Sequence, residues 1–126
     1  MRQVIMALAA ALAFAPLGIA QAQDAAAGQR VFNTCRACHT INEGGRAGVG
    51  PNLWGIVGRP AAAFPGFRYS ANMRTLGEGG HVWTEDNIRA YITNPKSVVP
   101  QGIMSYPGLR NEQQLNDLIA YLADQK

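Results

Sequence analysis

The sequence predicts one all-α domain made of about five short helices joined by long loops. A chain of 126 residues is the size of a single domain. Residues 111–122 repeat apolar side chains with helical spacing, whereas no segment shows a convincing strand pattern and no internal repeat is found. Residues 40–67 are rich in Gly and Pro and lack a helical period, which indicates a long irregular loop.

The first helix is expected over residues 24 to about 38, where Gly28 and Phe32 lie four positions apart and so share one face. A second, shorter helix is expected over residues 70–76, and the glycine-rich residues 77–80 are expected to end it.

The third helix is expected to begin at Thr84, because threonine is a good N-cap. Glu85 and Asp86 then occupy the first turn, where negative charge suits the helix dipole. Asn94 is expected to end the helix, since the residue before Pro95 avoids helical geometry. Its apolar face consists of Ile88, Tyr91 and Ile92.

The last helix has the clearest pattern in the chain. Residues 96–109 before it are expected to form a loop, since they contain several Pro and Gly residues. Asn111 is the expected cap, and Gln114 three positions later completes a capping box. The apolar residues that follow at helical spacing are Leu115, Leu118, Ile119 and Leu122.

The chemistry is expected at Cys35, Cys38 and His39, which form the sequence C-x-x-C-H. This is the attachment pattern of a covalently bound c-type haem, and the chain has only these two cysteines. Two thiols at this spacing can reach the two vinyl groups of one porphyrin, and His39 is then held under the iron as an axial ligand. Wrapping around a large flat cofactor would also explain a loop as long as residues 40–67.

Two other chemistries use the same residue types. A C-x-x-C pair can be a thiol–disulfide motif, although that motif favours a strand–turn–helix in an alternating β/α pattern, which this chain lacks. A Cys/His cluster can bind zinc, but a structural zinc site needs about four ligands, and only His81 is available to join the other three.

Residues 1–22 are expected to be a cleaved signal peptide. Arg2 gives a positive start, residues 4–20 are almost wholly apolar, and Ala20-Gln21-Ala22 matches the small-x-small cleavage pattern. Cleavage after Ala22 would leave residues 23–126 as a single domain. The alternative is an uncleaved anchor, because an apolar run of about 17 residues is at the short limit for spanning a bilayer.

Export would place the mature chain in the periplasm, where bacterial haem attachment occurs. Without Arg2 the chain carries ten Lys or Arg residues and eight Asp or Glu residues, a net charge of +2. No run of basic residues suits nucleic acid. We therefore expect no nucleic-acid partner. We also expect no stable membrane insertion once the signal is cleaved, and we expect a monomer.

The similarity to a known family extends well beyond the haem motif. The matching blocks run through residues 28–122 and resemble a class I cytochrome c of the soluble bacterial type, similar to mitochondrial cytochrome c. The resemblance implies the cytochrome c fold, an electron carrier rather than an enzyme, and one haem c attached through Cys35 and Cys38. The blocks are Gly28-x-x-x-Phe32, Cys35-x-x-Cys38-His39-Thr40, Gly50-Pro51-Asn52-Leu53, Gly58-Arg59, Pro65-Gly66-Phe67-x-Tyr69-Ser70, Trp83, Tyr91, Asn94-Pro95-Lys96, Pro100, Met104 and residues 117–122.

The resemblance also assigns the iron ligands. His39 would be the proximal ligand and Met104 the sixth, a pair that raises the reduction potential of the iron. The Pro51 carbonyl would accept a hydrogen bond from the other ring nitrogen of His39. The alternative for Met104 is a packing methionine, the role we expect for Met73. His81 is the other candidate sixth ligand, although we expect it to be a surface histidine.

Four further residues are implied around the cofactor. Arg59, Tyr69 and Trp83 match positions that bond or shield the buried haem propionates, since a buried carboxylate needs such partners. Tyr91 would lie near the Met104 sulfur. For Tyr69 and Trp83 the alternative is a plain role in the aromatic core.

The implied function is that of a periplasmic monohaem cytochrome of a respiratory chain, which shuttles single electrons between larger redox proteins. A quinol-oxidising complex would be the donor, and a terminal oxidase or a reductase the acceptor. One alternative is a small-molecule-binding or peroxidatic haem protein in which Met104 is displaced. The other is a membrane-anchored electron-input subunit of one enzyme.

The expected docking face departs from the lysine ring of mitochondrial members. Lys96 matches one of those lysines, and Arg36 and Arg46 fall at or near others, but Ile103 stands where mitochondrial members carry lysine. Gly102 replaces a hydroxyl residue that would bond a propionate. We therefore expect a face with fewer charges and more apolar contact, whose association rate depends less on salt.

Overall fold

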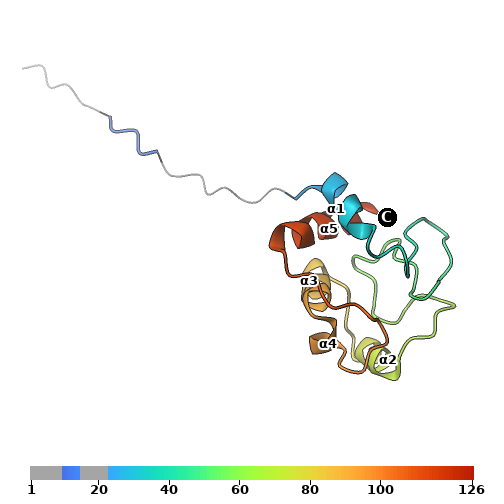
Figure 1. Ribbon diagram of the computed structural model, residues 1–126. Coiled ribbons are helices and arrows are strands. Elements are labelled where there is room, and N and C mark those ends of the chain that lie inside the picture. The colour runs from blue at the N-terminus through green and yellow to red at the C-terminus, as the bar shows by residue number, and fades with distance from the viewer. Residues whose placement is uncertain (1–9, 15–22) are drawn as a thin grey trace, which may run out of the picture.

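The computed structural model describes residues 10–14 and 23–126 (Figure 1). Apart from residues 10–14, the expected signal peptide over 1–22 and the alternative anchor over 4–20 lie outside the described residues. The described part contains five helices and no strand, so the all-α prediction is confirmed. Within those two ranges, no helix is both long enough and apolar enough to cross a bilayer.

The five helices of the described residues agree with the predicted number of about five, although only four of them were assigned to residue ranges. They are α1 (Ala25–Phe32), α2 (Ala71–Glu78), α3 (Glu85–Thr93), α4 (Pro95–Val98) and α5 (Glu112–Asp124). The fourth helix lies inside a segment that we expected to be a loop.

Side-chain caps start four of the helices. In each, the capping oxygen accepts a hydrogen bond from the backbone N–H three residues later at 3.0–3.1 Å, which satisfies one of the free donors of the first turn. The predicted caps Thr84 and Asn111 are therefore confirmed. The four caps are Asp24, Ser70, Thr84 and Asn111.

The predicted end of the first helix near Cys38 is wrong, because α1 ends at Phe32. Beyond it the backbone N–H of Thr34 donates to the Val31 carbonyl three residues back, at 3.2 Å. The Thr34 hydroxyl donates to the same Val31 oxygen at 2.8 Å. Local bonds of this kind compete with the helical pattern, and the chain continues as turns through the haem motif.

Two other boundaries differ from the prediction. Helix α2 continues two residues past Leu76 and stops at Gly79, followed by Gly80 with a φ of 87°. Helix α4 begins at Pro95, which is a favourable first helical residue because its missing N–H would have no partner there. A helix of four residues is too short for an apolar period, so the sequence pattern did not reveal it.

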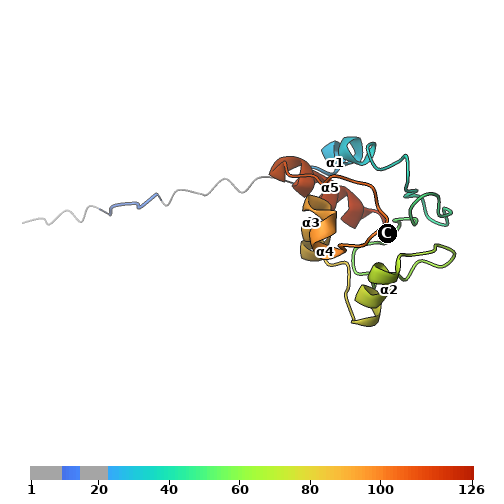
Figure 2. The same cartoon turned by 60° about the horizontal axis from the view of Figure 1, so that its bottom comes forward.

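The core is centred on the contact between α1 and α5, which lie side by side in both ribbon views (Figures 1 and 2). Phe32 is fully buried, and its ring centre lies 5.5 Å from that of Tyr121 on α5. A Cβ added to Gly28 would lie only 1.9 Å from the Asp117 carbonyl oxygen, so the two helix backbones approach each other closely there. Leu118 is buried in the same contact. The shared face predicted for Gly28 and Phe32 is therefore confirmed, and it is the face of α1 that packs against α5.

The close approach of the two helix backbones at Gly28 leads to a prediction about the stability of a Gly28→Ala variant. Alanine is the better helix former, so Gly28→Ala would stabilise α1 by about 1 kcal/mol if propensity decided the result. We expect the opposite, a loss of about 1–3 kcal/mol in the free energy of unfolding, because the methyl group overpacks the α1–α5 contact. The measurement is urea unfolding of the holoprotein. Gln29→Ala, at an exposed position of α1, should change stability by less than about 0.5 kcal/mol. A Gly28→Ala protein more stable than the parent would contradict the packing argument.

The remaining elements lie around this helix pair. Helix α3 contacts both α4 and α5. In both views the loops of residues 40–67, coloured cyan to green, lie on the opposite side of the molecule from α3 and α4 (Figures 1 and 2). Met73 on α2 is buried, in agreement with the core role expected for it.

Candidate functional site

The C-x-x-C-H residues lie in the turns directly after α1. The backbone N–H of Cys35 donates to the Phe32 carbonyl at 2.7 Å, and that of His39 donates to the Cys35 carbonyl at 2.9 Å. These bonds tie the motif to the end of α1 and so to the core. Cys35 and Cys38 are both free thiols, so both sulfur atoms are available for attachment to another group.

The surroundings of Cys35 argue against a thiol–disulfide site. Burial raises the pKa of the Cys35 thiol, and the Thr34 hydroxyl 3.8 Å away offsets only part of that effect. Reactive thiols in C-x-x-C motifs usually have a lowered pKa, because the thiolate is the nucleophile. The motif also follows a helix in an all-α fold and not a strand. Neither feature fits the redox alternative.

His39 is held in one orientation on two sides. Its Nδ1 atom lies 2.7 Å from the Pro51 carbonyl oxygen, the partner that the resemblance assigned to it. A Cβ added to Gly50 would lie 2.4 Å from His39 Cε1, so the Gly50 backbone lies directly against the ring. A carbonyl partner requires the proton on Nδ1, which leaves Nε2 with a free lone pair.

The charge state of His39 also suits a metal ligand. Burial lowers the pKa of the imidazole, and the hydrogen bond to Pro51 raises it by a smaller amount. The net lowering favours the neutral ring near pH 7. A neutral imidazole whose second nitrogen is hydrogen-bonded to a carbonyl is the usual form of a metal-bound histidine.

Asn52 supports this loop, a role that the sequence did not reveal. It is 2 % exposed, and its Nδ2 donates to the Thr40 hydroxyl and to the Asn42 carbonyl, both at 2.9 Å. Its Oδ1 accepts from the Trp54 backbone N–H at 2.9 Å. Asn52 thereby fixes the backbone that presents the Pro51 carbonyl. The only signal in the sequence was an asparagine after Gly-Pro, which also suits an ordinary turn.

Arg59 and Trp83 are brought together by pairing of two chain segments. The Trp83 N–H donates to the Arg59 carbonyl at 2.8 Å, and Pro60 pairs with Val82 in an isolated antiparallel bridge. The Arg59 guanidinium donates to the Asn52 carbonyl at 2.8 Å and also to the Trp54 carbonyl. Its remaining N–H groups can serve another acceptor. Burial lowers the pKa of Arg59.

The two tyrosines of the expected site are half-buried. The Tyr69 hydroxyl accepts from the Phe64 backbone N–H at 3.0 Å, and burial is the main cause that raises the Tyr69 pKa. Tyr91 lies against Trp83, with ring centres 5.0 Å apart, and burial raises its pKa as well. Both phenols therefore stay protonated near pH 7, so they can donate hydrogen bonds.

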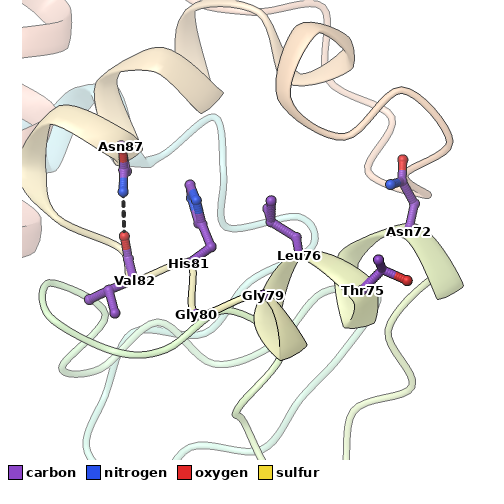
Figure 3. A pocket seen from close by; sticks show the side chains of 8 residues that line it. All are labelled: Asn72, Thr75, Leu76, Gly79, Gly80, His81, Val82 and Asn87. Atoms are coloured by element: carbon purple, nitrogen blue, oxygen red, sulfur yellow. Dashed lines mark hydrogen bonds between the residues drawn. The ribbon is translucent and has the colours of Figure 1, made fainter.

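His81 is not the simple surface histidine that we expected. Its ring lies edge-on to Trp83 at 4.9 Å between centres, and in the described part of the chain its buried Nε2 atom has no hydrogen-bond partner. The ring lines a pocket of about 570 Å³ (Figure 3). The pocket residues are Asn72, Thr75, Leu76, Gly79, Gly80, His81, Val82 and Asn87.

The zinc alternative has no support in the geometry. Among residues 10–14 and 23–126, no three His, Cys, Asp or Glu side chains come close enough together to hold a metal ion. His81 therefore does not join Cys35, Cys38 and His39 in a four-ligand site.

Met104 lies half-buried in the extended segment between α4 and α5. It lines a pocket of about 400 Å³ together with Lys96, Ile103, Ser105, Tyr106 and Pro107. Ile103 beside it is 64 % exposed, so an apolar side chain stands at the surface next to the thioether.

The haem fits the donor groups that are present. An imidazole with its free lone pair on Nε2 and a thioether are the axial donors of cytochromes c, and two free thiols are the groups that such a haem requires for attachment.

Comparison with known families and proteins gives consistent matches. The cytochrome c family pattern matches residues 25–126. A cytochrome c2 of Blastochloris viridis is 44 % identical over 104 residues, which cover 82 % of this chain and 79 % of the relative. A cytochrome c2 of Afifella marina is 40 % identical over 97 residues, which cover 77 % and 78 % of the two chains.

Solved structures match over almost their whole length. The ferricytochrome c2 of Rhodopseudomonas palustris has a TM-score of 0.75 and 38 % identity, and covers 82 % of this chain and 100 % of its own. Cytochrome cH of Methylobacterium extorquens has a TM-score of 0.72 and 35 % identity, with 79 % and 97 % covered. The architecture that the resemblance implied is thus confirmed.

Proposed function

Because this chain belongs to the cytochrome c family, whose members carry electrons on a covalently bound haem c and are not enzymes, we propose that it shuttles single electrons between larger redox proteins in the periplasm. The observation that supports this most strongly is the fixed His39 ring, with Nδ1 bonded to the Pro51 carbonyl and Nε2 left free. It stands beside two free thiols at the spacing that haem attachment needs.

The ligand set follows from these residues. When bound, the haem supplies an iron that alternates between the ferrous and ferric states. Cys35 and Cys38 would hold it covalently, and His39, through Nε2, and Met104, through its thioether, would bind its iron. Thioether ligation favours the ferrous state, so this pair sets a high reduction potential. With both axial positions filled by the protein, water and small molecules are kept from the metal.

Arg59, Tyr69 and Trp83 are the proposed partners of the haem propionates. Arg59 brings a partly buried positive charge, and the raised pKa of Tyr69 keeps its hydroxyl protonated and able to donate. Tyr91, whose ring centre lies 5.0 Å from that of Trp83, is the residue proposed to tune the Met104 sulfur. Neutralising buried propionates removes the cost of unpaired charge away from water.

Residues 1–22 are the proposed signal peptide, and residues 23–126 the mature monomer. The donor we propose is a quinol-oxidising complex, with a terminal oxidase or a reductase as acceptor. Exposed Ile103 gives the docking face an apolar centre, so partner association should depend only weakly on salt. An anchored subunit would instead keep residues 4–20, and the mass of the purified protein distinguishes the two forms.

Voltammetry of the mature holoprotein on an electrode tests the proposal. We expect one reversible wave for one electron, with a midpoint potential that does not change with scan rate, because neither iron ligand leaves during the redox cycle. A wave that splits or becomes irreversible would mean that Met104 dissociates on oxidation or reduction. The ligand-binding alternative would then replace the carrier.

A further inference from the structure

Two side chains form hydrogen bonds with the backbone of the loop that leads to Met104. The Lys96 ammonium donates to the Gly102 carbonyl oxygen at 2.5 Å. The Asn72 amide oxygen accepts from the Gln101 backbone N–H at 2.9 Å. Both bonds end on backbone groups within three positions of Met104, so neither depends on the identity of the loop side chains.

The two side chains that form these hydrogen bonds belong to different parts of the fold. Lys96 belongs to α4, directly before the loop, whereas Asn72 belongs to α2 and is 29 positions away from Gln101. The loop's own bond, from the Gly102 N–H to the Val99 carbonyl at 3.0 Å, connects it only to the end of α4. Asn72 therefore joins the loop to a separate element. Figure 3 shows Asn72 on α2, with its amide next to the loop that follows α4.

We propose that Asn72 and Lys96 are positioning residues that hold the Met104 loop closed and so set how often the sixth coordination position opens. This inference rests on the proposed function, in which Met104 is that ligand. Withdrawing the thioether requires residues 101–104 to move, and such a movement breaks both bonds. Local openings of this kind are set by the few contacts that hold the segment.

The size of the effect follows from what one such bond contributes. Both bonds are exposed to water, which competes for the same groups, so each is a modest restraint. Loss of one hydrogen bond of this strength should raise the fraction of open loop about threefold to tenfold. Carbon monoxide reaches ferrous iron only in the open form, so its binding rate should rise by the same factor.

The experiment measures the rate of carbon monoxide binding to the reduced holoprotein over hours, because binding to the closed parent is slow and leaves its spectrum unchanged in the first minutes. Asn72→Ala and Lys96→Met should each bind about threefold to tenfold faster than the parent. Asn72→Asp keeps the accepting oxygen and should restore the parent rate. The matched controls are Asn87→Ala and Lys126→Met. Asn87 lines the same pocket as Asn72 but donates to the Val82 carbonyl, and Lys126→Met removes a charge at the other end of the chain. Both should stay within about twofold of the parent.

A second readout separates positioning from general stability. In a urea titration, far-ultraviolet circular dichroism follows global unfolding, and the methionine–iron charge-transfer band of the oxidised protein follows ligation. A positioning role predicts that in both variants the band is lost at a much lower urea concentration than the helices. Parent-like binding rates in Asn72→Ala and Lys96→Met, or faster rates in the controls, would overturn the inference. Failure of the proposed ligation is seen separately, because a Met104→Ala protein would then bind carbon monoxide no faster than the parent.

Discussion

The double variant Cys35→Ala/Cys38→Ala is expected to contain no covalently attached haem and to accumulate as little folded protein. The two thiols are the only cysteines in the chain, so no other side chain can form a thioether. The cytochrome c domain, residues 25–126, is small and buries a small core by itself, so a ligand that binds only the native state supplies much of its stability. The measurement is the mass of the denatured protein together with the yield of holoprotein from the periplasmic fraction.

Single variants and a neighbouring residue complete this experiment. Cys35→Ala and Cys38→Ala should each keep at most one thioether and give an intermediate yield. The exposed Arg36 side chain donates to Asn33 Oδ1 and lies over the buried Phe32 ring, so Arg36→Ala should change the mass only by the substitution and keep about the parent yield. A double variant with normal yield and haem that survives denaturation would contradict the attachment scheme.

Met104→Ala is expected to keep its haem and to lose the sixth ligand. The covalent attachment depends on Cys35 and Cys38, so the mass should differ from the parent only by the substitution. Loss of the thioether should lower the reduction potential on the order of 0.2 V, within the roughly 0.8 V range that axial ligands span. It should also abolish the methionine–iron charge-transfer band. The measurements are a redox titration and the visible spectrum of the oxidised protein.

Met73→Leu provides the matched control for the loss of a thioether. Met73 is buried on α2, and leucine conserves its volume, so the fold should lose less than about 1.5 kcal/mol. Its spectrum and potential should match those of the parent. If Met104→Ala kept the parent spectrum and potential while Met73→Leu changed them, the sixth ligand would be assigned to the wrong methionine.

The sequence predicted those features that depend on short-range patterns. Thr84 and Asn111 were identified as caps because a capping bond joins residues only three positions apart. The apolar period of α5 likewise showed which face would be buried. The resemblance then supplied the order of the remaining blocks and the cytochrome c fold, which the solved relatives confirm.

Features set by long-range contacts or by very short elements were missed. Helix α4 has four residues, which are too few for a helical pattern of apolar residues to be recognised in the sequence. The His81 ring packs against Trp83 and its Nε2 atom is buried, and the hydrogen bond between Asn72 and Gln101 joins residues 29 positions apart. Asn52 becomes central only after the chain has folded back on Thr40 and Asn42. No local pattern carries such information.

The central claim is that the protein itself fills both axial positions of the haem iron, and one spectrum tests it directly. The visible spectrum of the reduced, mature wild-type protein should be recorded near neutral pH, before and after addition of carbon monoxide. An unchanged spectrum after minutes of exposure is the result predicted for a closed electron carrier with Met104 bound. An immediate shift of the haem bands would show an accessible sixth position and would contradict the account.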